Sequence, residues 1–452
     1  MIRREFIKKS IAGSAGIAIG AGFLLNSSCK GANDKIVLAL VGAGARGIST
    51  IINCCKINEN VTIKTVCDVN STKLANAAAA VEKELGYRPA TVGNMKEIMN
   101  DKDVDAVWVA TPQHWHAAAT IWACQARKDV YVEKTPSHTI WEGRKMIEIS
   151  RKYKRVVQVG YQNRSAAYGF SAREYIADGK LGKVVAVKCY NMLGGNKWTK
   201  QSEAPVPSWL DWEQWQGPAA AQPFNPGIVS ERGIGDYGFY WAYSGGALSD
   251  DATHQLDLVR LVLGDPPHPK SVYGWGGNHV FGGESETPEF QSIVYDFGDF
   301  TLECNSGYAT NYMIKTPNDI RRDNTRFPYW SNNATRVEIY GTEGLMYLGR
   351  MGGGWQVTGP NNEIVAQDGG VFPDNEHQTD FIHSLRVRKK PNGDIEECHR
   401  SATLVHLGNI AYRVGNTQLV FDDKTEKFLN NDKANTLARG TYREGYVIPE
   451  KV

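Results

Sequence analysis

Hydrophobic and polar positions divide the chain into two parts near residue 156. In the first part, short apolar runs alternate with helix-like stretches, and the runs cover residues 35–41, 61–67, 106–110 and 130–132. Strands that are apolar throughout are typical of a parallel sheet with both faces covered. The pattern predicts a doubly wound α/β Rossmann domain over residues 34–155, with residues 156–159 as the last clear strand of its sheet.

In the second part, apolar and polar positions alternate with a period of two. The strands expected there cover residues 184–190, 271–275, 291–297, 301–306 and 336–340, and residues 380–388 and 399–414 are expected to be helical. Alternation with hairpin-like spacing predicts an α+β domain over residues 156–452 with a large, mostly antiparallel open sheet. A stretch rich in Trp, Pro and Gly over residues 193–243 is expected to be a functional loop region.

The first 30 residues have the pattern of an export signal. Arg3 and Arg4 precede a run of Gly, Ala, Ile and Leu over residues 11–25, which predicts a twin-arginine signal peptide and a periplasmic protein exported in folded form. An uncleaved signal anchor is the alternative. Cys29 follows small residues as in a loose lipobox, so we expect a membrane-anchored lipoprotein, with ordinary cleavage near Ser28 as the alternative.

Composition excludes some classes of protein and leaves others open. The 452 residues fit two domains, and the net charge of +2 without a basic run gives no indication of nucleic-acid binding. The eight cysteines show no C-x-x-C pair and no metal-ligand spacing. We therefore expect buried free thiols and no metal site.

A glycine motif directly follows the first strand. Gly42, Gly44 and Gly47 form the pattern G-x-G-x-x-G, and the second strand ends at Asp68, 21 positions after Gly47. These glycines allow a tight turn, the approach of a pyrophosphate to the backbone, and close packing of helix on strand. Asp68 would bind the adenosine ribose and repel a 2′-phosphate, so NAD is the expected cofactor and NADP, which Lys73 leaves open, the less favoured one. A glycine-rich loop without a ligand is the alternative.

Further polar residues follow the next predicted strands or share a helix face. One strand leads into residues 111–116, and the next ends in Glu133 and Lys134. Ligands bind at such strand ends, where Lys134 could polarise a reacting hydroxyl. Asp250 and His254 lie four positions apart on a predicted helix, so the carboxylate could orient an imidazole that moves a proton. From position alone, a surface lysine, a helix N-cap and a core histidine are the alternatives.

These motifs occur together, and in this order, in one known family. The chain resembles the Gfo/Idh/MocA oxidoreductases in Gly42-x-Gly44-x-x-Gly47, Thr111-Pro112-x-His114-x-His116, Glu133-Lys134, Gly160-Tyr161-Gln162-Asn163-Arg164 and Gly245-Gly246-x-x-x-Asp250-x-x-x-His254. Residues 396–403 resemble members that carry twin-arginine leaders. The resemblance covers essentially all of the chain after the leader.

The resemblance implies a role for each matching residue. Lys134, Asp250 and His254 would be catalytic, with His254 as the acid/base, and Arg164 would join these three in contacting the substrate. The implied cofactor-binding residues are Gly42, Gly44, Arg46, Gly47, Asp68, Thr111, Pro112, His114, His116, Glu133, Lys134 and Gln162. Two positions depart from the family pattern: Thr135 separates Lys134 from Pro136, and a second carboxylate, Asp251, follows Asp250.

The leading hypothesis is an exported, NAD-dependent oxidoreductase that acts on a sugar or glycoside hydroxyl and retains its cofactor tightly. Two alternatives stay open: a redox-neutral NAD-dependent glycosidase or lyase that works through transient oxidation, and a non-catalytic NAD-bound sensor or structural protein. A homo-oligomer is expected from the open sheet face, and membrane contact only through a lipid anchor. Aromatic residues of the loop region could stack on a sugar or simply pack the loops; they are Trp198, Trp209, Trp212, Trp215, Tyr237, Tyr240 and Trp241.

Overall fold

The computed structural model describes residues 35–194, 198–230 and 236–451. The signal peptide expected over residues 1–30, with Arg3, Arg4 and Cys29, lies outside these residues. From Ile36 onward the chain forms one compact unit. In the described part of the chain, none of the helices has the length and apolar character needed to cross a membrane.

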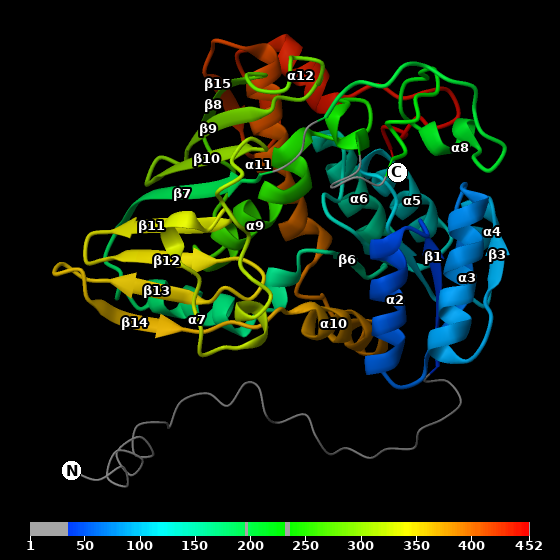
Figure 1. The fold of residues 1–452 in the computed structure, drawn as a ribbon, viewed down its shortest axis with the longest axis horizontal. Helices are drawn as coiled ribbons and strands as arrows, with labels where there is room; N and C mark the ends of the chain where they lie inside the picture. The colour runs from blue at the N-terminus through cyan, green and yellow to red at the C-terminus, as the bar shows by residue number, and fades with distance from the viewer. Residues whose placement is uncertain (1–34, 195–197, 231–235, 452) are drawn as a thin grey trace, which may run out of the picture. The chain divides into compact units, whose positions relative to one another are not determined.

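The first sheet has six parallel strands in the order β3-β2-β1-β4-β5-β6 (Figure 1). Its strands are β1 (Ile36–Val41), β2 (Val61–Cys67), β3 (Ala90–Val92), β4 (Ala106–Val109), β5 (Asp129–Val132) and β6 (Val157–Val159). The strand order reverses between β1 and β4, which is where such sheets bind ligands. The predicted doubly wound sheet is confirmed, and β6 corresponds to the last strand predicted over residues 156–159, whereas the short, exposed β3 was not predicted.

Helices from both halves of the sequence cover this sheet. The first half supplies α2 (Ala45–Ile57), α3 (Ser71–Leu85), α4 (Met95–Asn100), α5 (Gln113–Gln125) and α6 (Ile140–Lys152). The second half adds α10 (Asp374–Val387), whose Phe381 packs edge-on against Trp108 and Tyr131, and α11 (Ile395–Val414), whose first residues enter the same domain's core. A parallel sheet is buried on both faces and needs helices on each of them. Because the second half of the sequence supplies some of these helices, the boundary between the two domains does not fall at a single residue.

The second sheet has ten strands in the order β14-β13-β12-β11-β7-β10-β9-β8-β15-β16. Only β7 and β10 pair in parallel, and the other neighbours are antiparallel. The strands are β7 (Val184–Met192), β8 (Ser271–Gly277), β9 (Phe290–Asp296), β10 (Thr301–Gly307), β11 (Arg336–Gly341), β12 (Leu345–Gly349), β13 (Trp355–Thr358), β14 (Ile364–Asp368), β15 (Leu419–Asp422) and β16 (Lys427–Phe428). The predicted, mostly antiparallel sheet is therefore confirmed.

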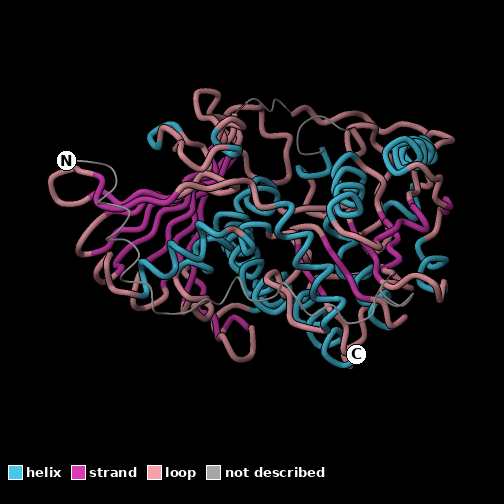
Figure 2. The backbone as a smooth tube through the Cα atoms, turned by 90° about the horizontal axis from the view of Figure 1, so that it is seen from below, coloured by secondary structure: helices cyan, strands magenta, loops and turns pink. Residues whose placement is uncertain are grey.

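Four helices of the described chain cover one face of this sheet: α7 (Ala167–Ala177), α9 (Thr253–Val262), α11 and the short α12 (Asp432–Arg439). Figure 2 shows helices lying between the two groups of strands. On the other face, Tyr273, Trp275 and Val294 are exposed, as alternation along β8 and β9 predicts. Helix α11 packs on both α6 and α9, so it joins the two halves of the compact unit.

The loop region from residue 193 to 243 has its own aromatic core. It contains the short helix α8 (Trp212–Gln216), and the shorter turns near it are tied by ring contacts. Trp198 stacks on Phe239 with 5.0 Å between ring centroids, and Trp212 stacks on Trp215 at 4.9 Å. Most of the aromatic residues considered for sugar stacking therefore pack the loops, because burying their rings stabilises a segment with little regular structure.

Candidate functional site

A crevice of about 460 Å³ lies at the carboxyl ends of β1, β2 and β4. Seven of the residues predicted to bind a cofactor line it: Gly42, Gly44, Arg46, Gly47, Asp68, Thr111 and Pro112. They come from three separate loops, which the parallel register of the strands brings to one edge of the sheet. The structure thus gathers the glycine motif and the acidic residue into a single cleft.

Each glycine of the motif meets a different steric demand. Gly42 has φ of +94°, and a Cβ there would lie 2.5 Å from the backbone oxygen of Ala110. A Cβ on Gly47 would lie 2.4 Å from the backbone oxygen of Gly42, whereas one on Gly44 would meet nothing within 4 Å. Helix α2 begins directly after Gly44. Gly44 therefore leaves open space beside free N–H groups of a helix start, which suits a diphosphate.

Asp68 is hydrogen-bonded to the backbone of the glycine motif and lines the crevice. Its Oδ2 accepts a hydrogen bond from the Ala43 N–H at 2.7 Å, and its Oδ1 accepts one from the Asn70 N–H at 2.8 Å. Burial raises the pKa of Asp68 above its ordinary value, although these N–H groups and Lys73 act in the opposite direction. Each carboxylate oxygen keeps a lone pair that a ribose hydroxyl can use. Lys73 and Lys96 also line the crevice, so its charge does not separate NAD from NADP.

The outer wall of the crevice consists of residues that were not predicted to bind the cofactor. They are mostly aromatic or apolar and include Trp115, Trp122, Trp215, Ile228, Val229, Tyr237 and Tyr446. Trp115 anchors this wall, since its Nε1 donates to the backbone oxygen of Trp215 at 2.9 Å and its ring meets that of Tyr446 edge-on at 5.5 Å. Trp215 and Tyr237, for which sugar stacking and loop packing were both left open, line the crevice of the glycine motif.

A second group of predicted residues meets where the two domains join. Lys134, two residues after β5, donates to Asp250 Oδ1 at 3.0 Å and also contacts the backbone oxygen of Asp250. The next residue, Thr135, donates its hydroxyl to the backbone oxygen of Ser249 at 2.7 Å. The residue that replaces the family's proline thus makes a second link to the same turn. These contacts hold the Lys134 ammonium group against Asp250.

Asp250 lies in a π-helical turn, Leu248–Ala252, which runs directly into α9. A wider turn of this kind changes which side chains share a face, and such turns occur often at functional sites. The expected contact between Asp250 and His254 is absent from the hydrogen bonds and ion pairs of the described residues, because Asp250 faces Lys134. That part of the prediction was wrong, although both residues do lie near Lys134.

His254 is buried, with 5% of its surface exposed, and its Nδ1 has no hydrogen-bond partner in the described part of the chain. Burial, followed by the positive charges of Arg350 and Lys134, lowers its pKa well below the ordinary value. The imidazole is therefore neutral near pH 7 and can accept a proton. The neighbouring carboxylate that acts on it is that of Asp251, which opposes this lowering.

Several residues predicted to bind the cofactor make contacts that hold the surrounding loops in place. His116 lies between the backbone oxygens of Thr111 and Thr135, each 2.7 Å from a ring nitrogen. Glu133 accepts from Arg46 Nε at 2.9 Å, and Arg46 also pairs with Asp374 of α10. Among the described residues, these contacts reach the lining of the dinucleotide crevice at Arg46 and at Thr111.

His114 and Gln162 are likewise committed to protein contacts. His114 lies 3.0 Å from the backbone oxygen of Trp215, and burial lowers its pKa to about 3. It lines a second cavity of about 260 Å³ together with His138 and His406. Gln162 is fully buried, donates to the Tyr131 hydroxyl at 3.3 Å, and keeps an Oε1 without a partner among the described residues.

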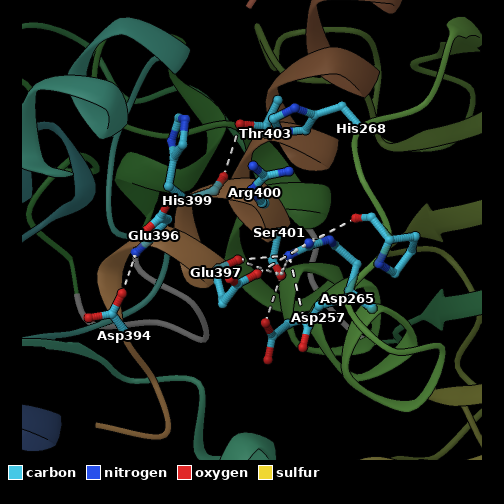
Figure 3. A network of polar contacts seen from close by, with 12 residues as sticks. Asp257, Asp265, His268, Asp394, Glu396, Glu397, His399, Arg400, Ser401 and Thr403 are labelled. Atoms are coloured by element: carbon cyan, nitrogen blue, oxygen red, sulfur yellow. Dashed lines mark hydrogen bonds and ion pairs between the residues drawn. The ribbon is translucent and has the colours of Figure 1, made fainter. Parts of the chain in front are cut away.

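Arg164, predicted to contact substrate, lies in a buried ionic network behind α9. Its Nε donates to Asp257 at 2.6 Å and its Nη2 to Asp265 at 2.9 Å. Ser401 of α11 also donates to Asp257 at 2.7 Å, and Figure 3 shows Asp257, Asp265 and Ser401 facing one another. With a side chain only 3% exposed, Arg164 acts as a support for α9 and does not reach the Lys134 cluster through any contact in the described chain.

The parallel sheet with its glycine crevice, joined to a second domain through a lysine–carboxylate cluster, defines a two-domain protein of the dinucleotide-binding class. Three family models match the chain: "Oxidoreductase family, NAD-binding Rossmann fold" over residues 36–161, "Oxidoreductase family, C-terminal alpha/beta domain" over residues 173–273 and 334–448, and "GFO/IDH/MocA C-terminal domain" over residues 230–347. The chain belongs to the Gfo/Idh/MocA oxidoreductase family.

Individual relatives agree with this placement. A 1,5-anhydro-D-fructose reductase of Ensifer adhaerens is 27% identical over 228 residues, which cover 49% of this chain and 57% of that protein. An alpha-N-acetylgalactosaminidase of Shewanella oneidensis is 28% identical over 171 residues, or 33% of this chain and 37% of that protein. The structure of a levoglucosan dehydrogenase in complex with NADH and levoglucosan superposes with a TM-score of 0.61 at 16% identity, covering 85% of this chain and 99% of the other.

Proposed function

We propose that the protein is an NAD-dependent oxidoreductase that acts on a hydroxyl group of a sugar or glycoside. The observation that carries this proposal is the contact between Lys134 and Asp250, with the neutral imidazole of His254 on the following turn, whose Nδ1 has no hydrogen-bond partner among the described residues. An ammonium group and a neutral base side by side are what the removal of a hydroxyl proton requires. The sugar-acting relatives support the substrate class, although the matched segments cover only part of those proteins.

The crevice fits a dinucleotide. Gly44 leaves space at the start of α2, Gly42 and Gly47 bring the loop close to the sheet, and Asp68 offers acceptor oxygens for a ribose. We favour NAD over NADP because the negative charge of Asp68 would repel a 2′-phosphate. A nicotinamide dinucleotide held by these residues would supply the hydride acceptor for the oxidation.

The protein's own residues would handle the proton and the oxygen. His254 takes the proton of the substrate hydroxyl, since burial keeps its imidazole neutral. Lys134 donates a hydrogen bond to the same oxygen as negative charge develops on it. Asp250 positions Lys134, and Thr135 fixes the distance between β5 and the π-helical turn.

Two variants with the cofactor site intact test this assignment. His254→Ala should lower kcat by about 10²- to 10⁴-fold, the usual contribution of a general base, while NAD binding by fluorescence titration stays unchanged. Lys134→Met should also lower kcat. His406→Ala, a buried histidine in the second cavity, is the matched control and should keep activity. Unaltered turnover in His254→Ala would remove His254 from the mechanism.

A redox-neutral glycosidase is the second candidate, favoured by the similarity to an alpha-N-acetylgalactosaminidase. Glycosides incubated with the purified protein and followed by mass analysis separate the two. A keto-sugar with stoichiometric NADH supports the dehydrogenase, and free sugar without NADH accumulation supports the glycosidase. Bound NAD without any product would favour a sensor.

We propose further that the protein is exported to the periplasm. Arg3 and Arg4 before a short apolar run support twin-arginine export to the periplasm with the cofactor already bound, and Cys29 supports a lipid anchor. Cell fractionation of the full chain, compared with an Arg3→Lys, Arg4→Lys double variant, tests the export. Palmitate labelling of a Cys29→Ser variant tests the anchor, and size-exclusion chromatography with light scattering tests the homo-oligomer.

A further inference from the structure

An excess of positive charge surrounds the π-helical turn that carries Asp250. The second carboxylate of this turn, Asp251, accepts from Arg350 Nη2 at 2.8 Å and pairs with Lys315 Nζ at 3.2 Å. Burial alone would raise the pKa of Asp251, but Arg350 and Lys315 outweigh it and lower the pKa below the ordinary range. Asp251 is therefore charged and bridges the two cations.

One carboxylate does not balance the cations that face it. Arg321 also interacts with Asp251 and with Arg350, and Lys134 lies against Asp250. Within residues 35–194, 198–230 and 236–451, two carboxylates thus face four cationic side chains, Lys134, Lys315, Arg321 and Arg350. Burial, followed by the positive charge of Arg350, lowers the pKa of Arg321. Arg46, the other cation that acts on His254, already has Glu133 and Asp374 as partners.

The cluster also has unused hydrogen-bond donors. The Nε atoms of Arg350 and Arg321 are buried and have no acceptor in the described chain. A buried guanidinium N–H without an acceptor is unfavourable, and an oxyanion supplies several acceptor oxygens at once. Lys315 keeps 43% of its side chain exposed, so this part of the cluster is partly open to solvent.

The position of the cluster connects it with the substrate and not with the cofactor. Lys315, Arg321 and Arg350 are absent from the lining of the dinucleotide crevice. They lie instead on the second domain, around the residue that follows Asp250, and Lys315 interacts with Asp250 itself. An anionic group held there would belong to the molecule whose hydroxyl faces Lys134 and His254.

We propose that the substrate is a sugar carrying an oxyanion, held by Lys315 and Arg321, with Arg350 fixing Asp251 beneath them. This inference rests on the proposed function, because it names the substrate class of the same site. A carboxylate, a sulfate ester and a phosphate ester share the required chemistry. Each would present oxygens to the ammonium and guanidinium groups while its ring hydroxyl lies at His254.

The test compares anionic sugars with their neutral parents. Glucuronate, a sulfated galactose and a phosphorylated glucose are each assayed against the unmodified sugar, with wild type, Lys315→Met and Arg321→Met. In wild type, at least one anionic sugar should exceed its parent in kcat/KM by about 10- to 100-fold, the usual effect of hydrogen bonds to a charged group. Lys315→Met should remove most of that advantage, because it should lower kcat/KM for the anionic sugar much more than for the neutral sugar. The arm with the largest ratio identifies the oxyanion.

Controls separate the failure of this inference from failure of the proposed function. Lys102→Met, at an exposed lysine elsewhere, should behave as wild type, and calorimetry of sugar binding to the NADH-loaded protein gives a readout without turnover. Equal kcat/KM for anionic and neutral sugars, or an equal loss for both in Lys315→Met, overturns the anionic substrate while the oxidoreductase stands. Absence of both turnover and binding with every sugar of the panel refutes the proposed function and this inference together.

Discussion

Substitutions at two glycines of the motif should have different effects, one on the stability of the fold and the other on binding of the cofactor. Gly44 and Gly47 both lie near the start of α2, but only Gly47 is confined. A Cβ on Gly47 would lie 2.4 Å from the Gly42 backbone oxygen and 3.0 Å from the Ala110 Cβ, whereas ordinary contacts begin at 3.4 Å. The helix must therefore move by about 1 Å away from β1 and β4 to accept alanine, a displacement that a packed core resists.

We expect Gly47→Ala to lower the free energy of unfolding by about 1–3 kcal/mol, the range for an overpacked core. Gly44→Ala should change it by less than about 0.5 kcal/mol. Its φ of −70° and ψ of 172° suit alanine, so the small gain from a less flexible unfolded chain and the small loss of a favourable N-cap nearly cancel. The added methyl group of Gly44→Ala instead occupies the space beside the helix start where a diphosphate would lie.

Urea unfolding with and without NAD measures both effects. At a concentration 100 times the dissociation constant, NAD should stabilise wild type by about 2.7 kcal/mol, and Gly44→Ala should lose this increment while matching wild type without NAD. Gly47→Ala should be weaker in both conditions. The reasoning is refuted if Gly44→Ala keeps the full stabilisation by NAD, or if both variants are equally unstable without it.

Three further predictions concern buried charges and the cofactor. Arg350→Met should destabilise the protein by about 3–5 kcal/mol, because it leaves the buried Asp251 without its closest cation, while Lys315→Met, whose lysine is 43% exposed, should cost less than about 1 kcal/mol in the same urea titration. Burial lowers the pKa of His114 from 6.5 to about 3. At pH values between these two pKa values, the unfolded state binds a proton that the folded state does not. The free energy of unfolding therefore falls as the pH decreases. Between about pH 7 and pH 5 this amounts to about 2 kcal/mol, and His114→Gln should show a correspondingly smaller loss; an identical pH dependence would contradict the assignment. Asp68→Ser should weaken NAD binding about tenfold or more in a fluorescence titration and improve NADP binding relative to NAD, and an unchanged ratio of the two affinities would exclude Asp68 from the ribose site.

Sequence patterns located most of the strands and helices because burial on one or both faces leaves a clear period. The first residue of a helix is harder to predict than the helix itself: α5 begins at Gln113, directly after Pro112, which suits a helix start. The strand β3 was missed because three partly exposed residues carry no hydrophobic pattern. The start of α11 at Ile395 was also missed, although Asp394 caps it.

Some features of the candidate site could also be predicted from the sequence, and others could not. Gly42, Gly44, Gly47 and Asp68 were predictable, because their roles depend on backbone geometry close in sequence. Lys134 and Asp250 were both predicted to be catalytic, but a hydrogen bond between them was not. This hydrogen bond depends on a π-helical turn that an α-helical pattern does not reveal. Arg164 was assigned to substrate, yet its partners Asp257 and Asp265 lie about 100 residues away and bury it.

By itself, the sequence determined the class of fold, the glycine motif and the residue types that chemistry needs, because periodicity and short-range spacing follow from local geometry. Only the tertiary structure decided which of those residues reach a cleft. It placed Trp115, Trp215 and Tyr446 on the crevice wall, and it set Lys315, Arg321 and Arg350 around Asp251. These groups lie far apart along the chain, and the packing of two sheets through α9 and α11 brings them together.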